Sequence, residues 1–180
     1  MKVSLSAKSL LQLRSNNPLV LLASVFFLLG VKVGDLAPEF ALKNQAGKPV
    51  SLSASMGHPV LIYFYPKDET PGCTEEACTL RDTFVQFQKR GVVIFGVSTQ
   101  DVESHQKFRA HHQLPFDLLV DPHGEVAAKF GVHMMIPGSD LLERKSVLIG
   151  PDGHIFRMYE KVNPSKHAQE ILADLNALKI

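Results

Sequence analysis

The chain has 180 residues, enough for one domain of ordinary size with a sizeable core of its own. Hydrophobic residues make up 45% and charged residues 21%, with 12 Gly, 11 Pro and two Cys, which excludes collagen-like, disordered and disulfide-dense chains. The formal net charge is +1, too small for the concentrated positive field of nucleic-acid-binding proteins. We therefore expect a globular protein that does not bind nucleic acid.

The amino terminus differs in composition from the rest of the chain. Three basic residues and no acidic residue precede an uncharged stretch of 17 residues, 15–31. This stretch resembles the apolar region of a secretory signal or a short membrane anchor, although it is at the short limit for crossing a hydrocarbon core of about 30 Å. We expect residues 1–31 to be a signal-like or membrane-anchor segment of an exported or membrane-associated protein, and residues 32–180 to form the domain. The alternative is a start codon assigned too early or a buried N-terminal helix, and then a cytoplasmic protein.

The first half of the domain has the pattern of a hairpin followed by central strands. Residues 40–42 and 49–52 flank a turn that contains Gly47, which predicts a short hairpin. Val60–Phe64 and Val92–Val97 are continuous apolar runs of strand length, typical of strands that helices cover on both faces.

A helix is predicted between these two strands. Ala77, Leu80, Phe84 and Phe87 recur at steps of three and four residues, so they form one apolar stripe on a helix that ends near Gly91. The two strands and this helix make a βαβ unit.

The second half continues the alternation of helices and strands. Its predicted elements are a helix over 101–112, a strand over 116–120, a short helix ending at 130, strands over 146–149 and 154–159, and a final helix over 168–178. The turn Gly150–Gly153 is short enough to make the last two strands antiparallel. The predicted fold is therefore a single α/β domain with a central mixed sheet flanked by helices and with an N-terminal hairpin.

The two cysteines lie where the first central strand gives way to the helix. In open α/β sheets this edge binds ligands, and a helix N-terminus offers free N–H groups and a partial positive charge. Thr70 suits the N-cap and Pro71 the first helical position, so Cys73 falls in the first turn, which favours its nucleophilic thiolate form. Glu75 and Glu76 oppose this, so a cation from elsewhere in the fold is expected.

Simpler roles for the cysteines remain open at this point. Either could be a small buried hydrophobic residue, above all Cys78, which is one position out of step with the apolar stripe. Cys73 and Cys78 are five residues apart and lack the paired spacing of zinc sites, and the eight histidines have no ligand-like spacing beside them. No metal site is therefore expected, and a C-x-x-C redox motif is absent.

The segment from Tyr63 to Cys78, YFYPKDETPGCTEEAC, resembles the active-site segment of the peroxiredoxins, specifically the bacterioferritin comigratory protein or peroxiredoxin Q subfamily. Val33–Phe40, Phe95–Ser98 and Asp121–Gly124 are similar to other segments of that family. The resemblance covers residues 32–178 and implies a thioredoxin-like fold.

The resemblance also implies roles for five residues. Cys73 corresponds to the peroxidatic cysteine, which a hydroperoxide oxidises to sulfenic acid, and Cys78 to the resolving cysteine. Thr70 corresponds to the threonine that hydrogen-bonds the thiolate and the peroxide, and Pro66 to the proline that shields the site from water. Arg144 corresponds to the family's arginine and supplies the missing cation.

Without the resemblance, several polar residues would be expected to have no functional role. Arg144 would then be a solvated charge, and Lys145 is its rival for the role of the cation. His111, His112 and His167 are most simply exposed residues of helices.

The implied function is that of a cofactor-free, thiol-dependent peroxidase, active as a monomer in antioxidant defence. It would reduce hydrogen peroxide and organic hydroperoxides to water and alcohols, and thioredoxin or a similar dithiol protein would recycle it. Two alternatives use other chemistry: a thiol-disulfide exchanger or peroxide-sensing relay with the same cysteines, and a membrane-tethered binding module.

Overall fold

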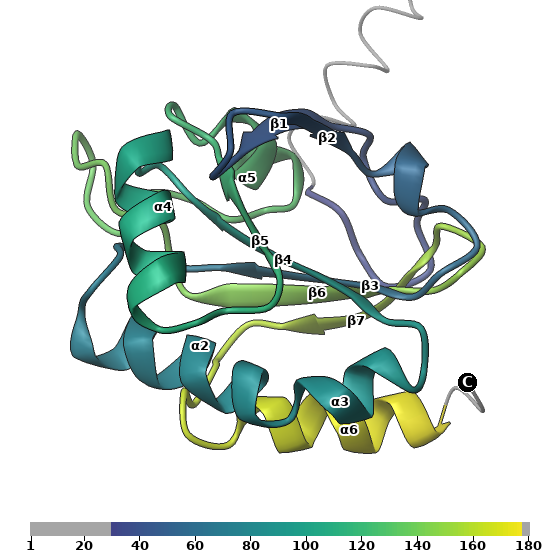
Figure 1. Ribbon diagram of the computed structural model, residues 1–180. Coiled ribbons are helices and arrows are strands. Elements are labelled where there is room, and N and C mark those ends of the chain that lie inside the picture. The colour runs from purple at the N-terminus through teal and green to yellow at the C-terminus, as the bar shows by residue number, and fades with distance from the viewer. Residues whose placement is uncertain (1–29, 178–180) are drawn as a thin grey trace, which may run out of the picture. The chain divides into compact units, whose positions relative to one another are not determined.

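The computed structural model describes residues 30–177, which form a seven-stranded sheet with helices on both faces (Figure 1). The strands are β1 (Ala41–Asn44), β2 (Pro49–Ser51), β3 (Val60–Phe64), β4 (Val93–Ser98), β5 (Asp117–Val120), β6 (Lys145–Ile149) and β7 (Ile155–Tyr159), in the order β2-β1-β5-β4-β3-β6-β7. The helices are α2 (Pro71–Asp82), α3 (Phe84–Gln88), α4 (Val102–His111), α5 (Glu125–Lys129) and α6 (His167–Ala177), with a 3-10 turn, η2 (Ser53–Ser55).

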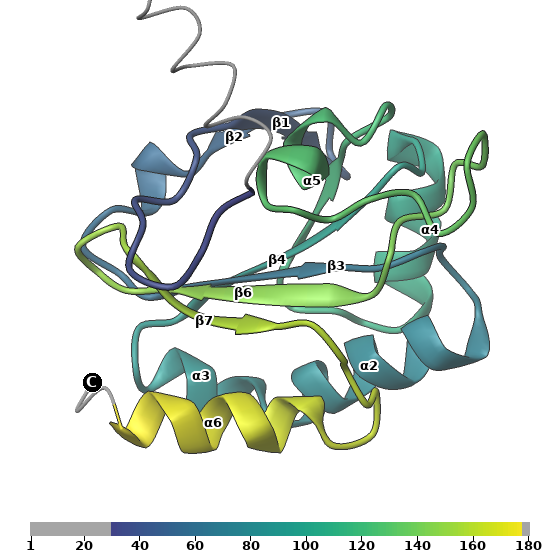
Figure 2. The same ribbon diagram turned by 180° about the vertical axis from the view of Figure 1, so that it is seen from behind.

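The predicted central strands are confirmed, with β3 between β4 and β6. All five residues of β3 are buried because the strand is covered on both faces. Leu61 and Tyr63 belong to the core cluster that contains residues of α2, α3 and α6, whereas Ile62 and Phe64 belong to the cluster that contains residues of α5. Figures 1 and 2 show α2, α3 and α6 together on one side of the sheet and α5 on the other.

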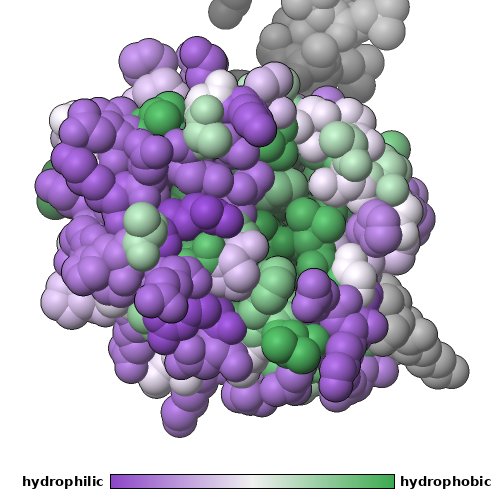
Figure 3. All heavy atoms as spheres, viewed as in Figure 1, coloured by the Kyte–Doolittle hydropathy of each residue, from purple (hydrophilic) through white to green (hydrophobic). Residues whose placement is uncertain are grey.

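The sheet is mixed, as predicted. β3 pairs with β4 and β4 with β5 in parallel, whereas β6 is antiparallel to both β3 and β7. The N-terminal hairpin β1–β2 turns at Gly47, whose φ of +72° is readily adopted by glycine, and β1 extends the sheet by antiparallel pairing with β5. The side of the molecule that carries α4 is mostly hydrophilic, whereas apolar side chains are visible between the hairpin and α3 (Figure 3).

The prediction of a single helix between β3 and β4 is wrong in one respect, because the structure has two helices there, α2 and α3. The break is at Thr83, whose backbone leaves helical geometry at φ −102° and ψ 3°. Its hydroxyl donates a hydrogen bond to the Thr79 carbonyl at 2.7 Å, and this local bonding competes with the helix. The apolar stripe itself is confirmed, since Ala77, Leu80 and Phe87 are buried in one cluster.

The predicted signal-like segment lies outside the described residues except for its last two, so it stays a prediction. Within residues 30–177, no helix is both long enough and apolar enough to cross a membrane.

Candidate active site

Cys73 lies in the first turn of α2, as the sequence predicts. Pro71 is the first helical residue, and Thr70 precedes it in extended geometry at φ −82° and ψ 147°. The loop that delivers α2 leaves the carboxyl end of β3, so the turn lies at the edge of the sheet where parallel strands end. Cys73 is 1% exposed and belongs to the core cluster on the α2 side of the sheet.

Arg144 reaches the Cys73 sulfur from the neighbouring strand. Its Nη2 donates a hydrogen bond to Cys73 Sγ at 3.1 Å. The antiparallel register of β3 and β6 pairs Phe64 with Lys145, so the residue before β6 lies beside the end of β3 and the start of α2. Gly72 makes room for the guanidinium, because a Cβ atom there would lie 3.3 Å from Arg144 Nη2.

Lys145, the rival cation, points to other partners in the described structure. Its Nζ pairs with Glu160 Oε2 at 2.9 Å and Glu143 Oε2 at 3.1 Å, and donates to the Gly131 carbonyl. Geometry therefore selects Arg144 as the cation beside Cys73.

Arg144 contacts a second acidic side chain, that of Glu76. From the sequence alone, Glu76 is expected only to be a negative charge that opposes formation of a thiolate at Cys73. Arg144 Nη1 donates to Glu76 Oε2, and the Glu76 side chain is fully buried. Burial raises the pKa of Glu76 to about 7, although the charge of Arg144 opposes the shift. When Glu76 holds a proton, no carboxylate charge competes with Cys73 Sγ for the guanidinium of Arg144. The spacing of three residues between Cys73 and Glu76 on one helix was the signal that these groups share a face.

The prediction that His167 is an exposed helix residue is wrong, because its side chain extends this buried network. The side chain is fully buried, with Nε2 at 2.8 Å from Ser146 Oγ and 3.9 Å from Glu76 Oε1. Burial, followed by the charge of Arg144, lowers the pKa of His167 to about 4, so the ring is neutral at neutral pH. Ile171 lies four residues on and is also buried, so the helical period could have placed His167 on the inner face.

Cys78 lies near a different partner from Cys73. Its Sγ is 4.0 Å from His112 Nδ1, and the residue is half-buried. His112 is also less exposed than expected, at 15% of its side chain, because its ring packs edge-on against Phe108. Both cysteines are free, and their sulfurs contact different side chains, Arg144 and His112.

Thr70 and Pro66 lie in the loop before α2, close in sequence to Cys73. The resemblance implies that the Thr70 hydroxyl donates to the Cys73 sulfur. In this structure the hydroxyl donates instead to the Lys67 carbonyl, at 3.0 Å. Pro66 is half-buried directly after Tyr65, at the end of β3.

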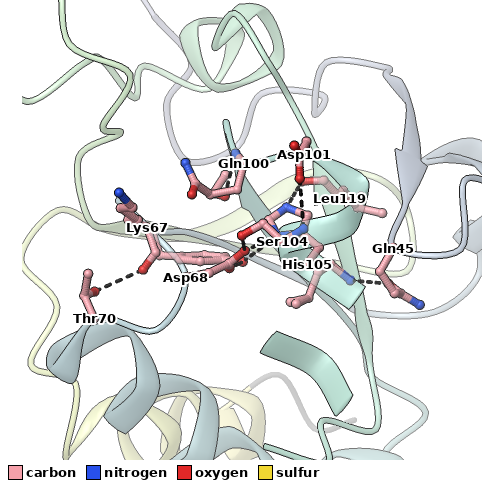
Figure 4. Close-up of polar contacts among 12 residues, drawn as sticks. Gln45, Lys67, Asp68, Thr70, Gln100, Asp101, Ser104, His105 and Leu119 are labelled. Carbon is pink, nitrogen blue, oxygen red and sulfur yellow. Dashed lines mark hydrogen bonds and ion pairs between the residues drawn. The ribbon is translucent and has the colours of Figure 1, made fainter. Parts of the chain in front are cut away.

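A buried polar network that sequence reasoning missed holds this loop in place (Figure 4). The Asp68 carboxylate accepts hydrogen bonds from Tyr65 Oη and Ser104 Oγ, each at 2.7 Å, and lies 2.9 Å from His105 Nδ1. Burial would raise the pKa of Asp68, but its bonds with His105, Ser104 and Tyr65 outweigh burial and hold that pKa below its ordinary value. His105 Nε2 faces the Leu119 carbonyl at 3.2 Å, so each ring nitrogen lies beside an oxygen atom of the network. The network ties the loop before α2 to α4 and β5.

Comparison with known proteins identifies the family. Residues 33–158 match the model of the AhpC/TSA family. Over 150 residues the chain is 41% identical to peroxiredoxin Q, chloroplastic, from Sedum lineare, which covers 83% of this chain and 80% of the relative. It is 39% identical to the putative peroxiredoxin bcp of Coxiella burnetii, covering 82% of this chain and all of the relative.

Solved structures agree with the sequence relatives. Peroxidoxin BcpB from Mycobacterium tuberculosis superimposes with a TM-score of 0.77 at 34% identity, covering 82% of this chain and 98% of that one. A variant of Xanthomonas campestris peroxiredoxin Q gives a TM-score of 0.72 at 34% identity, covering 78% and 92%. The predicted thioredoxin-like fold is thereby confirmed. The chain belongs to the AhpC/TSA family, and it is a thiol-dependent peroxidase of the peroxiredoxin Q and bacterioferritin comigratory protein type.

Proposed function

We propose that Cys73 is the peroxidatic cysteine of this peroxidase and that Arg144 activates it. The observation that carries the proposal is the hydrogen bond from Arg144 Nη2 to Cys73 Sγ, in the first turn of a helix. A thiolate, not a thiol, is the nucleophile, and both a neighbouring cation and a helix N-terminus favour the thiolate.

The first step transfers one oxygen atom to sulfur. The Cys73 thiolate attacks the terminal oxygen of a hydroperoxide, and the new S–O bond forms as the O–O bond breaks. Sulfur is oxidised to sulfenic acid, and the leaving oxygen departs as alkoxide or hydroxide and takes up a proton to give alcohol or water. The Arg144 guanidinium carries further N–H groups that can stabilise the charge developing on that oxygen.

The second step forms a disulfide with Cys78 as the resolving cysteine. The Cys78 sulfur attacks the sulfenic sulfur of Cys73, and the hydroxide that leaves takes up a proton to become water. The half-buried position of Cys78 on the same helix supports this assignment. A dithiol protein such as thioredoxin then reduces the disulfide and returns both thiols.

Thr70 and Pro66 complete the proposed site. We assign the Thr70 hydroxyl to hold the peroxide and Pro66 to shield it from water. Thr70 is three residues from Cys73, and its oxygen can turn its proton from the Lys67 carbonyl to a bound peroxide. We expect Thr70→Val to slow peroxide attack by about 10², and Thr70→Ser, which keeps the hydroxyl, to recover most of the rate.

Substrate and reductant are tested together by rapid kinetics. The bacterioferritin comigratory protein of Xanthomonas campestris, 34% identical to this chain, reduces alkyl peroxides, which supports a range that includes organic hydroperoxides. Stopped-flow oxidation of the reduced protein by hydrogen peroxide and by an organic hydroperoxide, followed by thioredoxin, should give fast oxidation and complete recycling. Cys73→Ser should abolish peroxide reduction. Near-normal turnover by that variant contradicts the assignment of Cys73. Slow oxidation of the wild type by every peroxide would favour the redox-relay alternative.

Cellular location and assembly form the last part of the proposal. The plant relative from Sedum lineare is a chloroplastic peroxiredoxin Q, which supports a targeting role for the amino-terminal residues of this chain. We propose that residues 1–31 direct the chain to or across a membrane and that the domain acts as a monomer. Fractionation of tagged full-length protein and size-exclusion chromatography of residues 32–180 test the two statements. A wholly cytosolic, uncleaved protein or a stable dimer contradicts them.

A further inference from the structure

Three potential ligand groups converge on the surface beside α4, separate from the thiol of Cys73. Glu69 lies in the loop just before α2, while His111 and His112 are the last residue and the C-cap of α4. Glu69 Oε1 is 3.1 Å from His111 Nδ1, and Glu69 Oε2 is 3.0 Å from His112 Nε2. All the ligand atoms lie within 4.8 Å of one another. Glu69 and His111 are 42 positions apart in the chain. The loop before α2 and the end of α4 therefore bring one carboxylate and two imidazoles together at the surface.

The spacing of these atoms suits a tetrahedral cation. Bonds of about 2.0 Å from zinc to nitrogen or oxygen require ligand atoms about 3.3 Å apart, and each oxygen of the Glu69 carboxylate lies near that distance from the nitrogen of one imidazole. Imidazole and carboxylate ligands are those of Zn²⁺ and its neighbours Cu²⁺, Ni²⁺ and Co²⁺. Two histidines and one glutamate also leave a fourth position for water.

The most buried of the three ligands is already held in position. The His112 ring packs against Phe108 at a centroid distance of 5.0 Å, and the His112 carbonyl accepts a hydrogen bond from Arg81 Nη1 at 2.8 Å. With Nε2 turned toward Glu69, Nδ1 faces Cys78 Sγ at 4.0 Å. A ligating histidine commonly uses its second nitrogen in this way, to fix ring orientation on a neighbouring group.

We propose that Glu69, His111 and His112 bind a divalent cation of the zinc class, and that this cation slows formation of the Cys73–Cys78 disulfide. The second half of the proposal rests on the proposed function. Glu69 directly precedes the N-cap of α2, and His112 at the end of α4 contacts Cys78, so the ion would tie the start of α2 to the end of α4 beside Cys78. A ligand that binds the folded arrangement more tightly than the unwound one shifts the equilibrium toward the folded arrangement.

The first experiment measures binding of Zn²⁺ by calorimetry, in the full-length chain with Cys73→Ser and Cys78→Ser so that thiolates cannot act as ligands. We expect one ion per chain, and a loss of affinity of at least ten- to hundredfold in His111→Ala and in Glu69→Gln. His111 is an exposed side chain and Glu69→Gln keeps the shape of the residue, so both variants should fold. His58→Ala removes another exposed histidine and is the matched control.

Two results overturn the site. One is the absence of stoichiometric binding in the cysteine-free chain, which would leave the three groups as a plain ion pair between histidines and a carboxylate. The other is equal affinity in His111→Ala and His58→Ala.

The second experiment follows disulfide formation after a stoichiometric pulse of hydrogen peroxide, with and without buffered Zn²⁺. Zn²⁺ should slow the step severalfold in the wild type and much less in His111→Ala. Equal slowing in both chains would assign the effect to the thiols and overturn the coupling, and so would no slowing in either. A wild-type chain that forms no disulfide even without Zn²⁺ would reject the proposed function of Cys78, while the binding experiment would still decide the cation site.

Discussion

Arg144 Nη2 lies 3.1 Å from Cys73 Sγ, although 71 residues separate the two in the chain. The contact depends on the pairing of β6 with β3, which brings the residue before β6 to the start of α2. It also places one positive charge between Cys73 and Glu76, the two acidic groups of α2 that face it. In the proposed mechanism, the way this charge is shared sets the reactivity of the Cys73 thiol, and the first predictions below follow from it.

We expect Arg144→Gln to slow peroxide attack on Cys73 by about 10² to 10³, because the variant loses the charge that stabilises both the thiolate and the leaving oxygen. Stopped-flow oxidation measures the rate. Lys145→Gln is the matched control, since the Lys145 amine contacts Glu143 and Glu160 rather than the sulfur, and its rate should stay close to wild type. The reverse ranking of the two variants would reassign the cation to Lys145.

Gly72→Ala should also slow peroxide attack, by displacing Arg144 rather than removing it. The added Cβ would lie 3.3 Å from Arg144 Nη2 and 3.8 Å from Pro164 Cγ, so the guanidinium must move by a few tenths of an ångström. Alanine also stabilises a helix by up to about 1 kcal/mol relative to glycine. Thr74→Ala raises helix propensity in the same turn without adding bulk beside Arg144. If Thr74→Ala slows attack as much as Gly72→Ala, helix propensity and not displacement of Arg144 is the cause.

The proposed Cys73–Cys78 disulfide would require α2 to unwind in each catalytic cycle. On an intact helix, residues five apart have Cα atoms about 8.6 Å apart and point about 140° away from each other, whereas a disulfide needs about 4.4 to 6.8 Å. In the structure α2 is continuous over both cysteines, and their sulfurs contact Arg144 and His112 respectively. Amide hydrogen exchange should therefore show loss of protection over residues 72–80 on oxidation.

Two controls accompany the exchange experiment. Peroxide-treated Cys78→Ser, which stops at the sulfenic or sulfinic acid, should keep its protection in α2 and should no longer turn over with thioredoxin. Residues of α4 should keep their protection in both redox states. Equal protection of α2 in reduced and oxidised protein, with a Cys73–Cys78 disulfide confirmed by mass spectrometry, would contradict the unwinding.

Glu76 and His167 should make opposite contributions to the pH dependence of stability. The pKa of Glu76 is raised from 4.5 to about 7 in the folded state, so its contribution is fully present below pH 4.5 and is lost as the pH rises to 7. The pKa of His167 is lowered from 6.5 to about 4, so its contribution is present above pH 6.5 and is lost as the pH falls to 4. The two trends oppose each other in the wild type.

Single variants should reveal each trend. From pH 4.5 to 7, the unfolding free energy of the wild type should fall relative to that of Glu76→Gln, by an amount on the order of a few kcal/mol. From pH 4 to 6.5, the unfolding free energy of the wild type should rise relative to the unfolding free energy of His167→Gln. Urea unfolding at a series of pH values measures both differences, and Glu75→Gln, which removes an exposed carboxyl on the same turn, is the matched control. A difference for Glu76→Gln that does not change with pH would mean that its carboxyl titrates in the ordinary range.

Local patterns in the sequence were sufficient for most of the secondary structure. The apolar runs of β3 and β4, the hairpin around Gly47 and the helix start at Thr70 and Pro71 all depend on residues within a few positions of one another. The break at Thr83 escaped prediction because the apolar stripe continues through it, and the stripe reports which face is buried but not whether the backbone is continuous.

The sequence by itself determined the α/β class of the fold, the position of Cys73 in a first helical turn and, through the family motif, the chemistry of the chain. Only the tertiary structure decided which cation lies beside Cys73, because the register of β6 on β3 selects Arg144 over Lys145. The burial of His167 against Glu76, and the meeting of Glu69 with two histidines of α4, were likewise decided there. These contacts join residues tens of positions apart, and sheet register and helix packing, which no local periodicity encodes, bring them together.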